Sequence, residues 1–428
     1  MSVEVPPRRV GPAEPVRHGR LGKRGPWGTI LKFLVAIVAV VSVGSVSIVA
    51  FAAWDVVSKV KPGIHLEPLP GHSARPVDNI NAIEGGVNLV LTGTDTRTGQ
   101  GGAFKGDLRS SSGVGNNDLT MLLHIAEDHK SATVVTFPRD LIVPIPSCPT
   151  SDGREYPASN AAMINTTLSR GGLSCTVRTV SSLTGLQIPF AAKITMAGVT
   201  AMSNAVGGVK VCLASPVIDR FTNPPLNLAA GLRTLKGAEA LSFLRSRHGV
   251  GDGGDLGRIS NQQVFLSALV RTVKSDGVLG NPLALYPLAN AAVSNMEFSD
   301  TLTNPRTLVQ IALALKNIDL SNVVFVQYPT LEYPLDRNRV IPNPVAAEAL
   351  GAALRADVPV KLSGKTGVGA SLPPTPSASP SPSPSASSSP GSPSPSPSTA
   401  SPSPTPVTLP SAVTGQTAAQ ETCTKGNR

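Results

Sequence analysis

Asn88-Leu-Val-Leu-Thr92 is a short run of apolar and β-branched residues bounded by polar residues, and Ala132-Thr-Val-Val-Thr-Phe137 repeats the pattern. Such runs are typical of strands that are buried in a sheet. Two later segments, Arg258–Lys274 and Pro305–Lys316, show helical spacing of their apolar residues instead. Because strands alternate with helices, the sequence predicts an α/β domain built on one sheet. We place this domain at residues 86–365, where the composition is that of a globular protein.

The N-terminal residues predict a membrane anchor. Residues 1–28 form a basic tail rich in Arg and Pro, and residues 29–53 form an apolar run whose only charge is Lys32. A helix needs about 20 apolar residues to cross a bilayer core, and this run supplies them. The alternative is a cleaved signal peptide that ends near Ala50–Ala53, with an apolar region about twice the usual length. Since the basic flank precedes the span, we expect a single-pass membrane protein with a cytoplasmic N-terminus and an extracellular domain.

Two segments that flank the domain are expected to lie outside its core. Residues 54–85 carry Pro, Gly and His with little periodicity, and we interpret them as a stalk. Residues 366–428 are interpreted as a Ser/Pro-rich low-complexity tail, in which the run from Pro374 continues in kind to about Pro406. Such a run favours extended polyproline II conformations and cannot bury a core. We therefore expect a disordered spacer, although residues 414–423 are less biased in composition.

Composition and motifs exclude several classes of function. The 428 residues carry a formal charge of +10, but the basic residues are not interleaved with aromatic ones as in a groove for single-stranded nucleic acid. We therefore expect no nucleic-acid partner, and the charge suits anionic phosphate polymers equally well. No C-x-x-C pair occurs, so a structural zinc site is not expected. A Walker A loop, a G-x-S-x-G elbow and an H-E-x-x-H helix are also absent from the sequence, which removes the commonest nucleotide-binding and hydrolase classes.

Arginines in the second half of the domain predict a phosphate-binding face. If Ala240–His248 is a strand, its two-residue period places Arg245 and Arg247 on the same face. Two adjacent guanidiniums repel each other, and their planar forks match the oxygens of a phosphate. On a helix, Arg258 and Gln262 stand one turn apart on a common face. The alternative is that these are solvated surface arginines with ordinary salt bridges.

Charged residues also stand at the ends of the predicted strands. Asp95 follows the first strand, and Asp118 precedes the next apolar run. Carboxylates in such positions often bind hard cations, and a divalent cation beside an arginine cluster is typical of phosphoryl transfer. The alternative is that each carboxylate caps a turn. Arg139 follows the strand that ends at Phe137, and it is either another phosphate ligand or a partner of Asp140.

Taken together and in chain order, these segments resemble the LytR-CpsA-Psr family over about residues 88–270. The segments that carry the resemblance are Asn88-Leu-Val-Leu-Thr-Gly-Thr-Asp-Thr-Arg97, Asn117-Asp-Leu-Thr-Met-Leu-Leu-His-Ile125, Phe137-Pro-Arg-Asp140, Ile164-Asn-Thr-Thr-Leu-Ser-Arg-Gly-Gly172, Ala205-Val-Gly-Gly-Val-Lys-Val211, Gly237-Ala-Glu-Ala-Leu-Ser-Phe-Leu-Arg-Ser-Arg-His248 and Asp255-Leu-Gly-Arg-Ile-Ser-Asn-Gln-Gln263. The single apolar N-terminal run and the Ser/Pro-rich tail suit an actinobacterial member of that family.

The resemblance implies an α/β/α sandwich around one mixed sheet, with a hydrophobic pocket for a polyprenyl chain. It also implies the transfer of a glycopolymer, such as a teichoic acid, from polyprenyl pyrophosphate at the membrane to a peptidoglycan sugar hydroxyl. Carried over by motif, Asp95 and Asp118 would hold Mg²⁺ on the pyrophosphate and would be catalytic together with Arg139. The residues that would bind the pyrophosphate oxygens are Arg97, Arg139, Arg245, Arg247, Arg258 and Gln262.

Two departures from the family's pattern bear on which polymer or acceptor is used more than on whether the protein is active. The second acidic motif usually reads Ser-Asp-Thr, whereas Asn117 and Leu119 flank Asp118 here, and Asn261 stands where an Arg usually precedes the Gln-Gln pair. Two other functions would use much the same residues. One is a protein that binds polyprenyl phosphates or tethers wall polymer without catalysis, and the other is a pyrophosphatase that uses water as the nucleophile.

The four cysteines are expected to meet an oxidising environment if the domain is extracellular. Cys148 and Cys175 lie in loop-like surroundings, and a disulfide between them would stabilise the fold by about 3–4 kcal/mol through the loop that it closes. We predict this disulfide. Cys212 lies in a predicted strand, where it is either a small buried apolar residue or the partner of Cys423. The second pairing requires the C-terminal end to fold back onto the domain.

Overall fold

The computed structural model describes residues 26–69, 86–97, 115–150, 152–275, 282–373 and 405–427. The chain divides into two compact units, Met1–Trp54 and Asp55–Arg428. The first unit contains most of the helix α1 (Pro26–Ser58), which is longer than the predicted run 29–53. No helix in the described ranges combines the length and the apolar character that a membrane span requires. The membrane anchor stays a prediction.

The second unit is built on a mixed sheet that has seven strands among the described residues. In spatial order these strands are β13 (Met296–Phe298), β8 (Phe190–Ile194), β1 (Val87–Thr94), β2 (Asn117–Ile125), β3 (Ala132–Phe137), β14 (Val323–Gln327) and β20 (Gly415–Thr417). The pairs β1–β8 and β3–β14 are parallel, and the other pairs are antiparallel. The two runs predicted as strands are therefore confirmed as β1 and β3, which lie on either side of β2 in one sheet.

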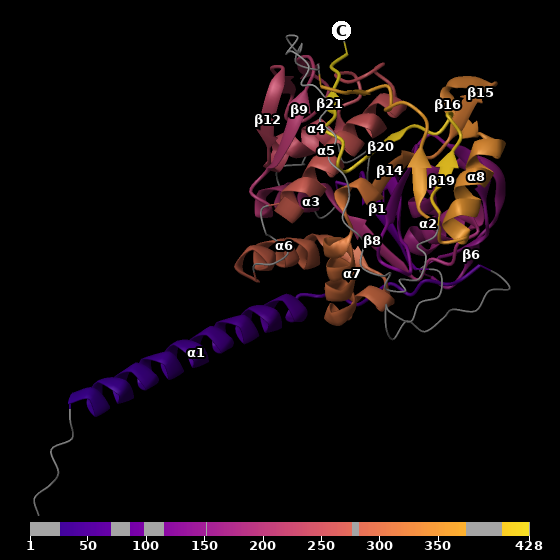
Figure 1. Ribbon diagram of the computed structural model, residues 1–428. Coiled ribbons are helices and arrows are strands. Elements are labelled where there is room, and N and C mark those ends of the chain that lie inside the picture. The colour runs from indigo at the N-terminus through magenta and orange to yellow at the C-terminus, as the bar shows by residue number, and fades with distance from the viewer. Residues whose placement is uncertain are drawn as a thin grey trace, which may run out of the picture. The chain divides into compact units, whose positions relative to one another are not determined.

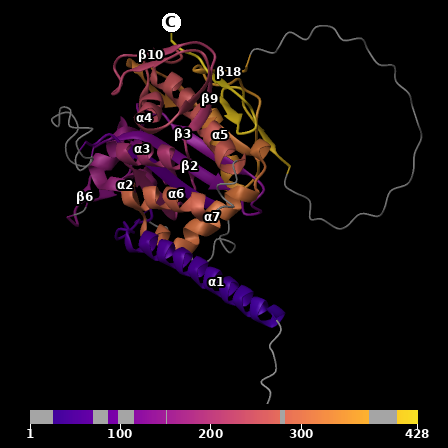
Figure 2. The ribbon, with the colours of Figure 1, turned by 90° about the vertical axis from the view of Figure 1, so that its left-hand side faces the viewer.

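Helices cover both faces of this sheet (Figure 1, Figure 2). On one face, Val90, Leu122 and Val135 pack with the apolar residues of two helices, α2 (Thr167–Thr184) and α8 (Pro344–Arg355). On the other face, Leu91 and Leu123 pack with α3 (Met196–Ala205), α5 (Asp255–Ser275), α6 (Pro282–Asn295) and α7 (Pro305–Asn317). Alternate residues of each strand thus belong to opposite cores, as the two-residue period requires. The predicted mixed α/β fold is confirmed.

One of the two helices predicted from their spacing, α7, begins at identifiable residues, and so does α8. The Asn304 side chain accepts a hydrogen bond from the backbone N–H of Arg306, and Pro305 occupies the first turn of α7. Asn343 and Pro344 begin α8 in the same way. An N-cap Asn followed by Pro fixes the start of a helix, because Pro lacks the N–H that the first turn leaves unbonded. The other predicted helix, Arg258–Lys274, lies within α5.

The strand expected over Ala240–His248 is wrong. Residues Gly237–Arg245 form the helix α4, and the backbone becomes extended only at Ser246. The reason lies in the spacing of the apolar residues, because Ala240, Leu241 and Phe243 are buried, and Ala240 and Phe243 pack in one apolar cluster with residues of α5. Arg245 ends the helix and Arg247 lies in the turn beyond it, so the two arginines do not share a strand face.

The C-terminal residues fold back onto the domain, so the prediction of a low-complexity tail over the whole of 366–428 is wrong. β19 (Val407–Leu409) pairs with β17 (Val360–Leu362), and β20 forms an edge of the main sheet. β21 (Cys423–Thr424) joins a second sheet, in which the order is β12 (Gly231–Leu235), β9 (Val209–Leu213), β21 and β18 (Ala370–Ser371). The buried residues of this segment are few and include Leu409, Val413, Ala418 and Cys423. Together with the backbone hydrogen bonds of the strands, they hold the segment to the domain. The Ser/Pro-rich residues 374–404 lie outside the described residues.

Part of the predicted stalk also lies against the domain. Ile64 donates a backbone hydrogen bond to Phe298 and accepts one from Asp300. Further along, the Glu67 carboxylate pairs with the buried guanidinium of Arg178, with 2.8 Å between Oε2 and Nη2. Residues 60–69 are therefore part of the folded unit, and residues 70–85 lie outside the described residues.

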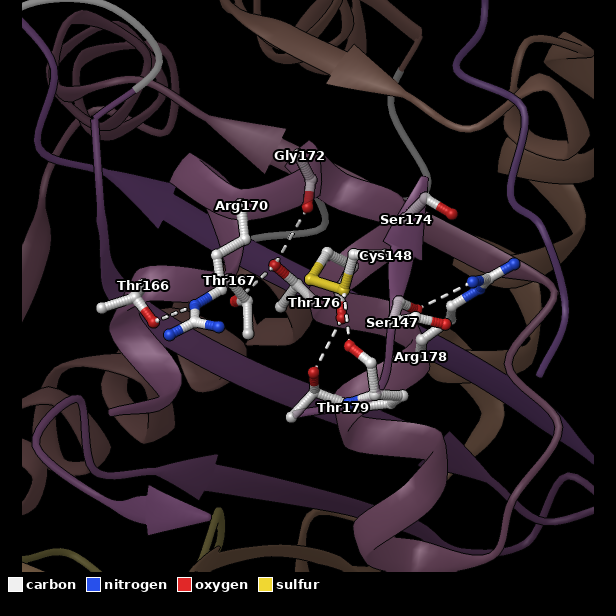
Figure 3. Close-up of a disulfide and its surroundings, with 12 residues drawn as sticks. Ser147, Cys148, Thr166, Thr167, Arg170, Gly172, Ser174, Thr176, Arg178 and Thr179 are labelled. Atoms are coloured by element: carbon white, nitrogen blue, oxygen red, sulfur yellow. Dashed lines mark hydrogen bonds between the residues drawn. A yellow bond between two sulfur atoms is a disulfide. The ribbon is translucent and has the colours of Figure 1, made fainter. Parts of the chain in front are cut away.

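Both disulfides considered for the sequence are present. Cys148 pairs with Cys175 across a Cα–Cα distance of 5.0 Å (Figure 3), and Cys212 pairs with Cys423 across 4.4 Å. Cys175 lies inside α2 rather than in a loop. At Gly171 a Cβ atom would approach the Cβ atoms of Cys148 and Cys175 to 2.7 and 3.1 Å, so a glycine leaves room for this bridge.

Candidate active site

The main sheet brings three of the predicted residues to one edge. β1 and β3 run in the same direction on either side of the antiparallel β2, so their ends meet the start of β2. Asp95 follows β1, Asp118 is the second residue of β2, and Arg139 lies two residues beyond β3. The topology therefore gathers the two carboxylates and the first arginine, although the chain separates them.

Asp118 is the residue to which the arginines converge. Its Oδ1 accepts a hydrogen bond of 2.6 Å from Nη1 of Arg139, and its backbone carbonyl accepts one of 3.1 Å from Nη2 of Arg258. Burial by itself raises the pKa of the Asp118 carboxyl, but the charges of Arg258, Arg139 and Arg245 together hold that pKa below its ordinary value. Asp118 is therefore ionised at neutral pH.

Two further carboxylates belong to the same network. Asp140 and Asp255 both accept hydrogen bonds from Nη2 of Arg247, at 2.8 and 3.0 Å. Asp255 also pairs with Arg258 across 2.6 Å and accepts the backbone N–H of Arg139 across 3.1 Å. The sequence contained a signal for each, because Asp140 follows Arg139 directly and Asp255 stands three residues before Arg258 on α5. The sequence predicts a site role for neither carboxylate, although it allows Asp140 as a partner of Arg139.

An apolar cavity of about 270 Å³ opens beside this network. Apolar side chains of β1, β2, α3, α4 and α5 form most of its wall. The charged or amide side chains of the wall are those of Asp118, Arg245, Arg258 and Gln262. Arg258 and Gln262 thus share one face of α5, as their spacing predicted. Leu119, the departure beside Asp118, also faces the cavity.

The remaining predicted residues differ in how they are held. Arg245 is half-buried and makes neither a hydrogen bond nor an ion pair with any residue that the structure describes. Gln262 is buried, and its amide nitrogen donates to the carbonyl of Leu244 across 3.0 Å, which joins α5 to α4. Arg97 is the last described residue before the gap at 98–114, and it makes neither a hydrogen bond nor an ion pair with the described residues. Arg245 is therefore the cation that points into the cavity with its donors uncommitted.

Asp95 provides the test of whether these residues suit a divalent cation. Burial raises the pKa of the Asp95 carboxyl, a hydrogen bond from the Asn116 backbone lowers it, and the charge of Asp118 raises it again, with a net rise. The site thus holds a second carboxylate whose negative charge is poorly compensated. A Cβ at Gly115 would approach Oδ1 of Asp95 to 2.6 Å, so only a glycine leaves the carboxylate open on that side. Among the described residues no group of three His, Cys, Asp or Glu is placed to hold a metal. Mg²⁺, however, usually takes one or two carboxylates together with substrate phosphates, so Asp95 and Asp118 fit it.

Asp219 is a site residue that sequence reasoning missed. It ends β10 (Val217–Asp219) and is 2% exposed. Its Oδ2 accepts from the Ser246 hydroxyl at 2.7 Å and from the backbone N–H groups of Arg247 and Gly249 at 3.2 Å, and its Oδ1 accepts from Phe221 at 3.0 Å. Burial raises the pKa of Asp219, but these hydrogen bonds outweigh burial and hold the pKa below its ordinary value. The carboxylate therefore fixes the turn that carries Arg247, and no local sequence pattern marks it.

The site combines an apolar cavity with arginines in and beside its wall, an arrangement that suits a ligand with an apolar part and an anionic part. The model of the LytR_cpsA_psr family matches residues 69–347, and the chain belongs to that family. It is 29% identical over 276 residues to the cell wall biosynthesis protein LcpA of Corynebacterium glutamicum, a match that covers 60% of this chain and 52% of LcpA. It is 28% identical over 167 residues to the polyisoprenyl-teichoic acid–peptidoglycan teichoic acid transferase TagU of Enterococcus faecalis, covering 39% of this chain and 50% of TagU.

Solved structures show the same fold. The LytR-Csp2A-Psr enzyme from Actinomyces oris superposes with a TM-score of 0.51 at 20% identity, covering 69% of this chain and 96% of that one. The chain spans about half the length of the curated relatives it matches. The C-terminal residues 405–427 lie outside the part that the family model matches.

Proposed function

We propose that this protein transfers a glycopolymer from a polyprenyl-pyrophosphate carrier to a peptidoglycan sugar hydroxyl. The observation that carries the proposal is the apolar cavity with Arg245 and Arg258 in its wall. A polyprenyl chain suits the apolar wall, and a pyrophosphate suits the arginines, whose forks match phosphate oxygens. The names of the relatives above, a polyisoprenyl-teichoic acid transferase among them, support the same class of substrate.

The arginines have donors to offer the pyrophosphate. The Nε atoms of Arg247 and Arg258 are buried and lack a hydrogen-bond partner among the described residues. An unsatisfied buried donor costs about 1–3 kcal/mol, which an anionic ligand would recover. Asp140 and Asp255 hold Nη2 of Arg247, and Asp255 also holds Nη2 of Arg258, so the cationic face is arranged before the ligand arrives. Arg139 would bind alongside them, with Gln262 and Arg97 assisting.

The proposed reaction is a displacement at the phosphorus that carries the polymer. The acceptor hydroxyl oxygen forms a bond to this phosphorus, and the bond to the bridging oxygen of the pyrophosphate breaks. Polyprenyl phosphate leaves with the electron pair of that bond and takes up the proton of the hydroxyl. Positioning and charge stabilisation supply most of the catalysis in such transfers. Arg139, Arg245, Arg247 and Arg258 would stabilise the leaving phosphate. Asp95 and Asp118 would hold Mg²⁺, which neutralises phosphate charge when bound.

The proposed place of action is the outer face of the cell membrane, with residues 29–53 as a single-pass anchor and the N-terminus in the cytoplasm. The two disulfides support this location, because disulfides persist in oxidising compartments. Both peptidoglycan and the lipid-linked polymer would be accessible there.

Purified full-length protein in detergent, given a polyprenyl-pyrophosphate-linked oligosaccharide and peptidoglycan fragments, tests the proposal. The expected product is an oligosaccharide phosphate bound covalently to peptidoglycan, and Arg245→Ala should reduce its formation. Release of oligosaccharide phosphate into water without acceptor product would instead identify a pyrophosphatase. Binding of the lipid with no turnover in the presence of Mg²⁺ would identify a protein that only binds it.

A further inference from the structure

The C-terminal residues Gly415–Asn427, here named the C-terminal clasp, contact α5 at two levels. Gln416 donates through Nε2 to the Gln263 carbonyl at 3.0 Å and to the Ser267 hydroxyl at 2.7 Å. Thr424 donates its hydroxyl to Oδ1 of Asn261 at 2.8 Å, and both side chains are fully buried. The clasp therefore holds the helix that carries Arg258 and Gln262.

Asn261 passes this contact on to α4. While its Oδ1 accepts from Thr424, its Nδ2 donates to the carbonyl of Phe243 at 2.6 Å. Phe243 stands two residues before Arg245, the end of α4. One amide thus joins the clasp to both helices that supply cations to the cavity. Asn261, which stands where the family usually has an Arg, therefore has a structural role in this chain.

The end of the clasp contacts the turn that holds Arg247. Asn427 donates through its side chain to the carbonyl of His248 at 3.0 Å and through its backbone to that of Gly249 at 2.9 Å. Gly251 donates its backbone N–H to the carbonyl of Lys425 at 2.9 Å. Asp219 holds the opposite side of the same turn, so the turn is fixed between a buried carboxylate and the clasp.

A covalent bond fastens the clasp. Cys423 is bonded to Cys212 of β9, and β21 pairs with β9 in parallel (Figure 1). The Ser/Pro-rich residues 374–404 separate the clasp from the rest of the domain in sequence. The covalent attachments of the clasp to the domain are therefore the chain at one point and the disulfide at another.

We propose that the C-terminal clasp is a positioning element of the phosphate site, locked by the Cys212–Cys423 disulfide. It sets the positions of Arg245, Arg247 and Arg258 through Asn261 and through the Arg247 turn, and it touches no substrate itself. The inference rests on the proposed function for the ligand, a polyprenyl pyrophosphate. It extends that function to a part of the chain that lies outside the family match.

The first experiment separates the clasp from the domain in two steps. A protease recognition sequence is inserted among residues 374–404 of the full-length protein, and affinity for farnesyl pyrophosphate is measured by calorimetry. Cleavage alone should leave the affinity unchanged, because the disulfide retains the clasp. Cleavage followed by reduction should release the clasp and weaken binding by about tenfold or more, as loss of orienting contacts does at ligand sites.

The uncut protein under the same reductant is the control. It loses both disulfides, but the chain keeps the clasp at high effective concentration, so its affinity should stay near the oxidised value. Unchanged affinity after the clasp has been cut and reduced, whether it is released or stays bound, would overturn the role of the disulfide as a lock. Release without loss of affinity would also overturn the proposal that the clasp positions the phosphate site.

The second experiment changes one hydroxyl. Thr424→Val keeps the shape but leaves Oδ1 of Asn261 buried without its donor, and should weaken farnesyl pyrophosphate binding several-fold, within about tenfold. Binding of farnesol, which lacks the pyrophosphate, should not change, and Thr424→Ser should restore the affinity for farnesyl pyrophosphate. Equal losses for both ligands, or no loss for either, would contradict a positioning role.

The outcome for the proposed function can be distinguished from the outcome for the clasp. Arg245→Ala in the intact protein tests whether farnesyl pyrophosphate binds at the cavity at all. If it binds there and depends on Thr424, but no polymer is transferred to peptidoglycan, the clasp stands and the transferase proposal fails. If transfer occurs and Thr424→Val has no effect on affinity or transfer, the transferase proposal stands and the clasp proposal fails.

Discussion

At the scale of single residues, the two neighbouring carboxylates Asp95 and Asp118 have opposite pKa shifts. Burial raises the pKa of Asp95, so its ionised form is less favourable in the folded chain than in the unfolded one. Asp95→Asn should therefore raise Tm in the absence of Mg²⁺, because it removes the charge and keeps an oxygen to accept from Asn116. The same change should lower Mg²⁺-dependent transfer by at least about 100-fold, since a catalytic cation contributes several kcal/mol.

Thermal unfolding with and without Mg²⁺ measures the change in stability, and the transfer assay measures the change in activity. The wild type should gain stability from the cation by mass action, and Asp95→Asn should gain less. Glu332→Gln, at an exposed carboxylate on β15 (Thr330–Tyr333), is the matched control and should change neither quantity. A lower Tm for Asp95→Asn without Mg²⁺ would contradict the raised pKa.

The pKa shift of Asp219 is opposite in sign to that of Asp95, so its carboxylate should stabilise the fold. Its folded pKa is lowered from the ordinary value of 3.8, so its contribution is fully present above that value and is lost as pH falls through the lower, folded pKa. Asp219→Asn should destabilise the fold by about 1–3 kcal/mol at neutral pH, because the amide cannot accept all four hydrogen bonds. The difference from the wild type should shrink in strong acid. Urea unfolding at neutral pH and below pH 3 measures it, and a constant difference would exclude the carboxylate charge as the cause.

At the scale of elements, α3 and α5 both supply apolar side chains to the wall of the cavity. Met202 of α3 faces this space, so Met202→Trp should fill part of it and weaken farnesyl pyrophosphate binding by at least about tenfold. Binding of inorganic pyrophosphate should persist, which also shows that the site remains folded. Val309→Trp, at an exposed position of α7, is the control. Equal loss of both ligands in Met202→Trp would argue against a polyprenyl chain in this cavity.

The sequence predicted elements that show either a bounded apolar run or apolar residues at helical spacing. The strand at Asn88–Thr92 and the helices α5 and α7 follow from such patterns, and they place Asp95, Arg258 and Gln262. α4 was misread because Arg245 and Arg247 suggested a period of two, whereas burial of Ala240, Leu241 and Phe243 decides the helix. The error shows that polar spacing is a weaker guide than the buried face.

Contacts between distant segments were beyond the reach of local patterns. The burial of Asp219 and the pairing of β21 with β9 join residues far apart in the chain, and neither leaves a periodic signal in a short window. The composition of residues 414–423 and the cysteine at 423 were the available signals for the clasp. Asp140 and Asp255 were visible in the motifs, but their role depends on the position of Arg247, which only the tertiary structure fixes.

At the scale of the whole molecule, the Cys148–Cys175 disulfide lies beside the attachment of residues 60–69. Arg178, one turn along α2 from Cys175, donates to the carbonyl of Ser147 at 2.9 Å (Figure 3). It also pairs with Glu67. The double change Cys148→Ala, Cys175→Ala should lower the free energy of unfolding by about 3–4 kcal/mol through the loop that it opens. Urea unfolding under oxidising and reducing conditions measures this loss. The two proteins should converge in reductant, and a persistent difference would assign the loss to packing around the cysteines.

The location of the domain can be tested with the same inserted protease site that tests the clasp. If residues 29–53 anchor the chain and the domain lies outside the cell, protease added to cells whose wall has been removed should cut within residues 374–404. The C-terminal fragment should then remain attached to the membrane fraction through Cys423, because this cysteine is bonded to Cys212. Reductant should release the fragment, and Cys212→Ala should weaken its retention without reductant. A second site inserted before residue 26 should resist the same protease in intact cells. Cleavage at the N-terminal site with protection at residues 374–404 would reverse the proposed orientation, since a basic flank on the cytoplasmic side is what predicts it.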